Sequence, residues 1–474
     1  SLKKHGFDPY GHRFERTTVL KDIKENFDKF NGKEEVVAGR ILGKRDHGKI
    51  KFFDIIDESG QLQVYISENN LDDRSKLLIQ YLDIGDIIGV SGTIIKTKTN
   101  EISISAKKLD ILTKSLIPLP HRWYGLEDTE TRFRKRYLDL IMNPEVKDRI
   151  KKASKVISAV RRLLESKGFT EFETRVLQPI YGGANAKPFI THYNALDRDM
   201  YLRVSDELYL KRLLVGGYEK VFEIGKDFRN EGMDTMHNPE FLMLELYQAY
   251  ADLSDMINIT KEIIKTVAYE LNNSYDVSFD NALIHLDKFE TIKMEDSVIK
   301  FLGKKEPKEL IEIAKGIDPL VSTYGEAINT LFEEYVQKKL IQPTFVTTYP
   351  IEVSPLAKRV EDNPKFVYRF ELFINGMEIA NAFSELNDPI DQIERFKLEA
   401  ERRKRGVVDT QQMDEDFIEA LGYGMPPAGG LGIGMGRLQM LITGTKSIKE
   451  VIPFPQLRTI LNDKDDIQTV GKNK

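Results

Sequence analysis

The stretch from residue 221 to residue 250, VFEIGKDFRNEGMDTMHNPEFLMLELYQAY, most constrains the fold. Its pattern predicts two strands joined by a polar loop that contains His237 and Asn238. Side chains two apart in a strand share a face, so Arg229 and Glu231 are expected on one side of the first strand.

The second predicted strand has two different faces. Leucines at 242, 244 and 246 form an ordinary buried face. The opposite face carries Phe241, Met243, Glu245 and Tyr247. An aromatic ring, a carboxylate and a phenol in that arrangement indicate either a solvated face or a binding site.

Composition excludes several classes of protein. The net charge of the 474 residues is only −5, so any nucleic-acid-binding surface must be local. The chain has no cysteine, which excludes disulfides, cysteine-ligated zinc and a thiol nucleophile. We find no signal peptide and no apolar run that could span a bilayer, so we expect a cytoplasmic protein without a membrane segment.

The sequence pattern of residues 35–112 predicts a small β-barrel. Short β-rich runs are separated by turn signals such as His47-Gly48 and Ser59-Gly60, with one helical patch at 71–82. This order fits an oligonucleotide-binding OB-fold, although any five-stranded barrel would give a similar pattern. Phe52 could stack an unpaired base or could be a core ring.

The next segments predict the frame of a second domain. Asn143-Pro144 begins an amphipathic helix that ends near Gly168, and a strand is expected at 169–174. A loop at 181–189 contains Gly183, and a strand-to-helix segment at 201–214 has Glu207 near the helix start. Residues 258–336 are mostly helical and charged.

Residues 366–385, FVYRFELFINGMEIANAFSE, predict a hairpin that turns at Asn375-Gly376. In the expected register Phe373 opposes Glu378, Leu372 opposes Ile379, and Glu371 is diagonal to Glu378. Two carboxylates on one face either bind a divalent cation together with phosphate oxygens or splay into water. Asn381, Phe383 and Glu385 share a face further along.

A glycine-rich run at 429–436 leads into Arg437 and an apolar helix. Glycines let the backbone approach a ligand, and Arg437 sits at the helix entry. These blocks, in this order from about Tyr10 to Arg458, resemble motifs 1, 2 and 3 of class II aminoacyl-tRNA synthetases. The residues of these motifs are most similar to those of bacterial lysyl-tRNA synthetases.

The resemblance implies an α+β fold: the class II antiparallel sheet flanked by helices, with an N-terminal all-β OB-fold domain. The expected domains are a helical segment at 1–34, an anticodon-binding OB-fold at 35–117, a linker at 118–142, a catalytic domain at 143–460 with a helical insertion at about 258–340, and a polar tail at 461–474. The implied substrates are L-lysine, ATP and tRNA(Lys), with Mg²⁺ as the cofactor and a homodimer as the assembly.

The resemblance also implies residue roles. ATP would be bound by Arg229, Glu231, His237, Asn238, Phe241, Glu371, Glu378 and Arg437, with Arg229 and Arg437 catalytic and Glu371 and Glu378 holding the metal. Lysine would be bound by Gly183, Glu207, Glu245, Tyr247, Asn381, Phe383 and Glu385. The anticodon would be contacted by Arg45, Phe52, Gln63 and Glu101.

Charge favours lysine over the acidic and amide substrates of the same subclass. Three carboxylates, Glu207, Glu245 and Glu385, select a cationic amino acid, whereas an aspartyl enzyme would need a cation there. The chain departs from the family pattern at three positions, Arg175, Met236 and Gly436. A synthetase-like paralogue that binds tRNA or nucleotide without charging it, or an aspartyl or asparaginyl enzyme, therefore remains an alternative.

Overall fold

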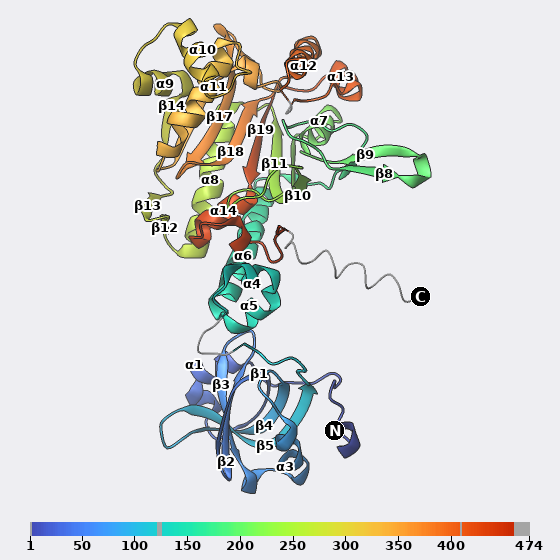
Figure 1. Ribbon diagram of the computed structural model, residues 1–474, viewed down its shortest axis with the longest axis vertical. Helices are drawn as coiled ribbons and strands as arrows, with labels where there is room; N and C mark the ends of the chain where they lie inside the picture. Colours follow the sequence, from blue (N-terminus) through green and yellow to red (C-terminus); the bar gives the residue numbers. More distant parts are fainter. Residues whose placement is uncertain (1, 121–125, 408–409, 459–474) are drawn as a thin grey trace. The chain divides into compact units, whose positions relative to one another are not determined.

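The computed structural model describes residues 2–120, 126–407 and 410–458, which form two compact units (Figure 1). One unit holds the residues up to 132 together with 137–143, and the other holds 133–136 and the residues from 144 onward. The predicted polar tail at 461–474 lies outside the described residues, as do residues 121–125 of the predicted linker.

The first unit is a closed barrel in the order β1-β2-β3-β5-β4, as the strand spacing predicted. Its strands are β1 (Glu34–His47), β2 (Ile50–Ile56), β3 (Gln61–Ser67), β4 (Ile87–Lys96) and β5 (Ile102–Thr113). Alternate side chains, among them Phe53, Ile55 and Val64, are fully buried inside the barrel. The same alternation places Phe52 on the outer face, so Phe52 is not a core ring.

Short helices accompany the barrel: η1 (Leu2–His5), α1 (Leu20–Glu25), α2 (Phe27–Phe30), η2 (Glu68–Asn70), α3 (Asp73–Leu78) and η3 (Ile79–Tyr81). The predicted N-terminal helix is therefore shorter than expected. This segment is also part of the barrel core, because Leu20 and Ile23 are fully buried there. The connector that follows contains α4 (Thr129–Arg134) and α5 (Arg136–Met142).

The second unit is built on a nine-stranded sheet in the order β14-β15-β17-β18-β19-β11-β10-β6, with β16 paired to β17. The strands are β6 (Thr170–Glu171), β10 (Lys220–Phe228), β11 (Glu240–Ala249), β14 (Glu290–Lys293), β15 (Thr344–Pro350), β16 (Arg359–Val360), β17 (Asn363–Ile374), β18 (Met377–Ser384) and β19 (Ala428–Gly434). Neighbours are antiparallel except at the two ends, where β14 pairs with β15 and β6 with β10 in parallel.

One face of this sheet is closed by α6 (Pro144–Ser166), α8 (Leu253–Asn272) and α14 (Met435–Thr443), whose apolar stripes share one core with the sheet. Leu244, Leu246, Ala380 and Ala382 point into that core, as their alternation predicted. The side chains between them therefore point to the opposite face of the sheet, which carries the cavity described below.

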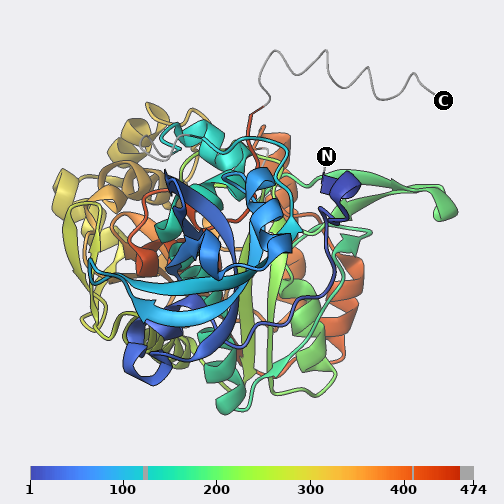
Figure 2. The same cartoon turned by 90° about the horizontal axis from the view of Figure 1, so that it is seen from below.

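Other elements surround the sheet. Helices α9 (Met294–Leu302), α10 (Pro307–Lys315) and α11 (Tyr324–Tyr335) cluster at its β14 edge (Figure 1). The region 258–336 also contains three strands that were not predicted: β14 and the two-stranded sheet of β12 (Asp276–Phe279) and β13 (Ala282–His285). Strands β7 (Leu177–Gln178), β8 (Ile190–Tyr193) and β9 (Arg198–Leu202) form a separate sheet, and the β8–β9 hairpin projects outward in both views (Figures 1 and 2).

The remaining helices lie around the cavity face or in connections. They are η4 (Asn194–Leu196), α7 (Glu207–Val215), η5 (Gln337–Lys339), η6 (Ile351–Val353), α12 (Pro389–Lys404), α13 (Glu415–Gly422) and η7 (Ile448–Glu450). None of the helices in the described parts of the chain combines the length and apolar character that a membrane crossing requires.

Two predicted strands are shorter in the structure. The strand expected at 169–174 is only β6. The amide of Phe172 still donates to the carbonyl of Phe222 on β10 (2.8 Å), but Thr174 donates from its amide and its hydroxyl to the Glu223 side chain instead of to a strand. Strand β10 ends at Phe228, so Arg229 and Glu231 lie in the following loop and not on the strand. The amide of Asn230 donates to the carbonyl of Lys187 (2.8 Å), which draws the chain out of the sheet.

The β17–β18 hairpin turns at Asn375 and Gly376, which both have positive φ (49° and 73°) as this tight turn requires. Phe373 faces Glu378, as predicted, but Leu372 faces Ala380 and not Ile379. The extra residue is a β-bulge, which shifts the register of everything beyond it. Consequently Asn381 lies directly opposite Glu371, and the simple diagonal expected for Glu371 and Glu378 is wrong.

Candidate active site

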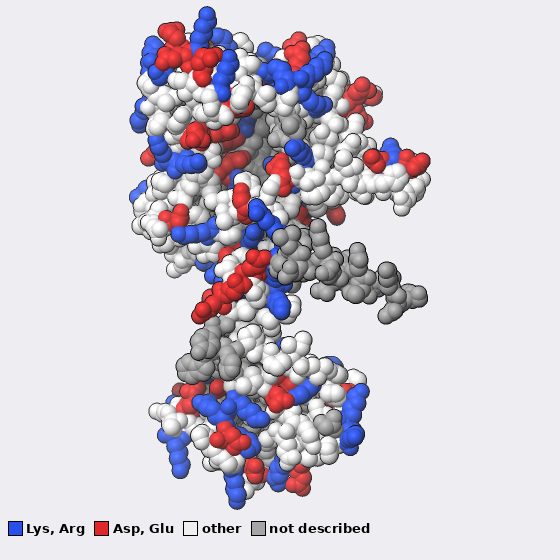
Figure 3. All heavy atoms as spheres, viewed as in Figure 1, with Lys and Arg blue, Asp and Glu red and all other residues white. Residues whose placement is uncertain are grey.

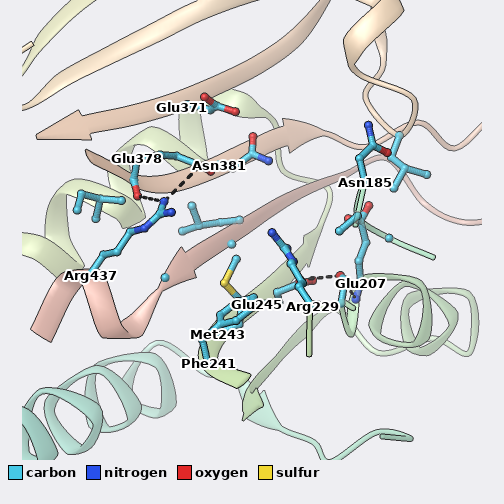
Figure 4. A pocket seen from close by; sticks show the side chains of 18 of the residues that line it. Asn185, Glu207, Arg229, Phe241, Met243, Glu245, Glu371, Glu378, Asn381 and Arg437 are labelled. Atoms are coloured by element: carbon cyan, nitrogen blue, oxygen red, sulfur yellow. Dashed lines mark hydrogen bonds and ion pairs between the residues drawn. The ribbon is translucent and has the colours of Figure 1, made fainter. Parts of the chain in front are cut away.

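A cavity of about 380 Å³ in the second unit collects every residue predicted to bind ATP or lysine. On the face shown in Figure 3, acidic side chains gather in a hollow of this unit. The predicted residues that line the cavity are Gly183, Glu207, Arg229, Glu231, His237, Asn238, Phe241, Glu245, Tyr247, Glu371, Glu378, Asn381, Phe383, Glu385 and Arg437. In Figure 4, Arg437 and Glu378 lie at one end and Glu207 at the other.

Arg229 lies in the middle of the cavity and has a donor to spare. Its guanidinium lies over the Phe241 ring, 5.0 Å from the centroid, in a cation–π contact. Its Nε is buried, and no group among the described residues accepts a hydrogen bond from it. A buried donor without a partner is costly, so this N–H is available to donate to an oxygen of a ligand.

Arg437, in the first turn of α14, lies at the end of the cavity opposite Glu207 (Figure 4). Two contacts hold its guanidinium there. Its Nη1 donates to the carbonyl of Glu378 (2.7 Å), and its Nη2 lies 3.0 Å from Nε2 of His237. The Nδ1 of His237 is 2.8 Å from the carboxylate of Asp234, which orients the ring. Asn238 serves the loop itself, because its Nδ2 donates to the carbonyl of Glu240 (2.6 Å).

Gly436 is explained by what packs against it. A Cβ at this position would lie 2.8 Å from Cδ1 of Ile448, so a longer side chain would have to displace Ile448. Gly436 offers no side chain to orient Arg437, which is held by the backbone carbonyl of Glu378 and the ring of His237. Of the other two departures, Met236 packs beside the core of the second unit, and Arg175 is exposed beside the Tyr209 ring.

Glu245 is positioned by two hydroxyl groups. It accepts hydrogen bonds from Oγ of Ser205 (2.8 Å) and from the phenol of Tyr247 (2.7 Å), and all three residues are buried. Strand alternation predicted that Glu245 and Tyr247 share a face, but nothing in the sequence indicated Ser205. Ser205 comes from the turn before α7, which only the tertiary structure brings to β11.

A lysine that was not predicted lies among the pocket carboxylates. Lys211, one turn after Glu207 on α7, is completely buried. Its ammonium pairs with Glu207 (2.5 Å) and with Glu385. The Glu207–Lys211 spacing of four residues on a predicted helix was a usable signal, because such residues share one helix face.

Burial changes the protonation of these groups. Desolvation, with added repulsion from neighbouring carboxylates, raises the pKa of Glu207 to about 8, although Lys211 opposes the shift. Burial likewise raises the pKa of Glu385 to about 7. Burial alone would lower the pKa of Lys211, but the two adjacent carboxylates raise it above the usual value, so the ammonium stays charged.

Behind Glu245 lies a second set of acids that sequence reasoning missed. Asp206 and Asp227 are fully buried, and one oxygen from each approaches one oxygen of Glu245 within 4.8 Å. Arg203 is their counter-ion, 3.2 Å from Asp227 and 2.6 Å from Glu223. Desolvation raises the pKa of Asp227 to about 8, and that of Asp206 is also well above the usual value.

Glu371 and Glu378 supply carboxylates to the Arg437 end of the cavity. Glu371 accepts from the phenol of Tyr349 (2.8 Å) and pairs with Arg369 (2.5 Å). Desolvation raises its pKa to about 7, and repulsion from Glu378 adds to the shift. Two carboxylates fit Mg²⁺ when substrate phosphates and water complete its octahedron, so this donor set is compatible with the metal.

Sequence reasoning also missed Arg369 and Tyr349, which both contact Glu371. Besides Glu371, Arg369 donates to Oδ1 of Asn381 (3.1 Å) and lies 5.5 Å from the Phe383 ring. The β-bulge makes this possible, because it places Asn381 opposite Glu371.

The predicted anticodon residues lie in the barrel, within the first unit. Arg45 and Phe52 face each other on β1 and β2, and Phe52 faces Tyr65 on β3. The Arg45 guanidinium lies 5.7 Å from the Phe52 ring and pairs with Asp54 (3.0 Å). Gln63 accepts from Ser103 (2.8 Å), whereas Glu101 is exposed before β5 and paired with Lys24 (3.5 Å).

Comparison with known proteins identifies both units. The family of class II tRNA synthetases (D, K and N) matches residues 128–458, and the OB-fold nucleic acid binding domain matches residues 36–112. The lysine–tRNA ligase of Pelotomaculum thermopropionicum is 52% identical over 470 residues, which cover 96% of this chain and 92% of that protein.

Other relatives agree over the same length. The lysine–tRNA ligase of Carboxydothermus hydrogenoformans is 52% identical over 96% of both chains. That of Halalkalibacterium halodurans is 46% identical over 97% of this chain and 95% of its own. The chain therefore belongs to the class II aminoacyl-tRNA synthetases and, within them, to the lysine–tRNA ligase family.

Proposed function

We propose that the protein activates L-lysine with ATP to lysyl-adenylate and then transfers lysine to the 3′ end of tRNA(Lys). The observation that carries this proposal is the convergence of Glu207, Glu245 and Glu385 in the same cavity as Arg229 and Arg437. Carboxylates at one end recognise a cationic amino acid, and arginines further along receive a triphosphate.

The first step needs no general base, because the lysine carboxylate is already ionised when it attacks the α-phosphorus of ATP. The protein contributes by positioning the two reactants and by stabilising negative charge on the phosphate. Arg229 would hold the α-phosphate with the Nε that lacks a protein partner. Phe241 and Arg437 would enclose the adenine, with His237, Asn238 and Glu231 supporting the nucleotide.

Glu371 and Glu378 would hold Mg²⁺ against the phosphates. When bound, the ion offsets the negative charge that develops as pyrophosphate leaves. Arg369 and Tyr349 already contact Glu371 and keep its carboxylate oriented towards the cavity.

Lysine would bind with its ammonium groups among the three pocket carboxylates, beside Gly183, Tyr247, Asn381 and Phe383. An aspartate or asparagine substrate brings an α-ammonium but no cationic side chain, so one buried carboxylate would have no counter-ion, which is unfavourable in a site of low dielectric. The lysine carboxylate would point towards Arg229, where the α-phosphate is expected.

The barrel would read the anticodon. The row of Arg45, Phe52 and Tyr65 offers an aromatic surface beside a guanidinium, the combination on which unpaired bases stack. Gln63 and Glu101 would add polar contacts. We also propose that the protein works as a homodimer and in the cytoplasm, where ATP, lysine and uncharged tRNA meet.

ATP–pyrophosphate exchange with each of the twenty amino acids tests the function. Exchange that depends on lysine alone is the expected result. Exchange with aspartate or asparagine would assign the chain to the neighbouring specificity. No exchange with any amino acid, while nucleotide or tRNA still binds, would favour a paralogue that does not charge tRNA.

A further inference from the structure

We propose that Lys211 determines how much positive charge the amino-acid pocket accepts, because it permanently neutralises one of the three pocket carboxylates. This inference rests on the function proposed above. It assigns a specificity-determining role to a residue that does not line the cavity and that would not touch ATP.

Lys211 lies directly behind the pocket carboxylates and not at the protein surface. It extends from α7, is completely buried, and places its ammonium between Glu207 and Glu385, which come from different elements. The ammonium also lies 5.8 Å from the centroid of the Tyr247 ring. Among the ion pairs of the described residues, those of Lys211 are the ones that reach the pocket carboxylates.

The charges of the pocket then match those of one substrate. Glu207, Glu245 and Glu385 carry three negative charges when ionised, and Lys211 cancels one of them. Lysine brings two ammonium groups, on its α-carbon and at the end of its side chain, and these offset the remaining two charges. An amino acid with a neutral side chain brings only its α-ammonium and leaves one buried carboxylate unpaired, which is unfavourable.

Without Lys211, Glu207 and Glu385 would hold a proton more tightly. Two buried carboxylates that share a site cannot both stay ionised, so the pKa of the pair rises when its counter-ion is removed. Lysine would then have to displace that proton to bind. At neutral pH this costs roughly a factor of ten in affinity for each unit by which the pKa rises.

Titratable and charged groups face Lys211 from each of the elements packed around it. They are Glu207 on α7, Glu385 after β18, and Glu245 and Tyr247 on β11, with Asp206, Asp227 and Arg203 behind Glu245. From α13 and its N-cap, Asp416 and Asp414 engage the neighbouring Arg212 instead. Of these acids, Glu207 and Glu385 are the ones that pair directly with Lys211, so their protonation is the part of the pocket's pH response that its removal changes.

The test is Lys211→Met in the full-length protein, which keeps the length of the side chain and removes its charge. We expect the KM for lysine in ATP–pyrophosphate exchange to rise roughly tenfold or more at pH 7, and the KM for ATP to stay unchanged. The ratio of variant to wild-type KM for lysine should shrink as the pH rises from 6.5 towards 9. A ratio that is constant with pH, or a lower KM for lysine, would overturn the proposal.

Two further variants make the result specific. Lys226→Met removes an exposed lysine that pairs with Glu240 (3.0 Å), and it should leave both KM values unchanged. The double variant Lys211→Met/Glu385→Gln removes both partners of one buried pair, which costs less folding free energy than removing one. Its KM for lysine should be no higher than that of Glu385→Gln alone, whereas additive losses would indicate that Lys211 only packs.

The wild-type protein separates this inference from the function. If it shows no lysine-dependent exchange, the proposed function fails before Lys211 is tested. If it exchanges with lysine while Lys211→Met behaves like Lys226→Met, the function stands and the role of Lys211 is wrong.

Discussion

The cavity of the second unit and the outer face of the barrel both carry predicted binding residues, but they hold them in opposite ways. Glu207 and Glu385 are 5% and 1% exposed, and each is tied to another charged side chain. On the barrel, the Arg45 side chain is 51% exposed. A charge in the cavity therefore acts in a low dielectric, whereas a charge on the barrel is screened by water.

This difference teaches how to interpret substitutions in each unit. In the cavity, removal of one group leaves its buried partner unpaired, so effects should be large and not additive. On the barrel, the side chains proposed to contact the anticodon lie on a solvated surface. Substituting one of them should therefore have a modest effect on tRNA binding and charging, and none on lysine activation.

The largest effect is expected for Arg229→Ala. The substitution removes a group aimed at the phosphate on which charge develops, so the rate of lysine-dependent exchange should fall about 1000-fold. Binding of tRNA, measured separately by filter retention, should not change. Exchange within roughly tenfold of wild type would show that Arg229 does not act on the reacting phosphate.

Glu245→Gln should come next. Glu245 already accepts from Ser205 and Tyr247, so a neutral amide loses the ammonium attraction while keeping the shape. The KM for lysine should rise about 100-fold, equivalent to about 3 kcal/mol, while the KM for ATP stays within roughly threefold. Steady-state exchange kinetics measure both, and equal changes in the two constants would break the pocket assignment.

The KM of the wild-type protein for lysine should depend on pH, because buried carboxylates of the cavity change protonation near neutral pH. In the empty pocket, the pKa values of Glu207 and Glu385 are about 8 and about 7, and a bound ammonium lowers them. Binding therefore releases protons, so the KM for lysine should fall as the pH rises from 6.5 to 8 and then level off. The fall should be at most about tenfold per pH unit for each proton released. A KM for lysine that rises over this range would contradict the protonation of these carboxylates.

The smallest effect is expected on the barrel, for Phe52→Ala. Loss of one stacking ring on this solvated face should weaken tRNA charging by roughly fivefold, the low end of the range for base stacking, and leave lysyl-adenylate formation unchanged. Phe53→Ala is the matched control, because Phe53 is the neighbouring ring inside the core. It should lower the free energy of unfolding of the barrel by about 3–5 kcal/mol, measured by denaturant titration. If Phe52→Ala abolished adenylate formation, the division of labour between the two units would be wrong.

Sequence patterns anticipated the elements best where alternation and turn chemistry agree. The faces of β11, the turn at Asn375-Gly376 and the barrel strands follow from side-chain periodicity and from backbone preferences. Bulges and strand ends were not anticipated. Ile379 looks like any other strand residue, and the carbonyl of Lys187 that ends β10 is far away in the chain.

By itself, the sequence determined which residues reach the cavity. Strand alternation predicted those of β11 and β18, and the resemblance to the class II motifs supplied the others, such as Glu207 and Arg229. Only the tertiary structure decided how their charges are balanced. Lys211, Arg203 and Arg369 lie in segments whose local pattern is that of an ordinary helix or strand. They become counter-ions of the site only because folding removes water from around carboxylates that come from several separate elements.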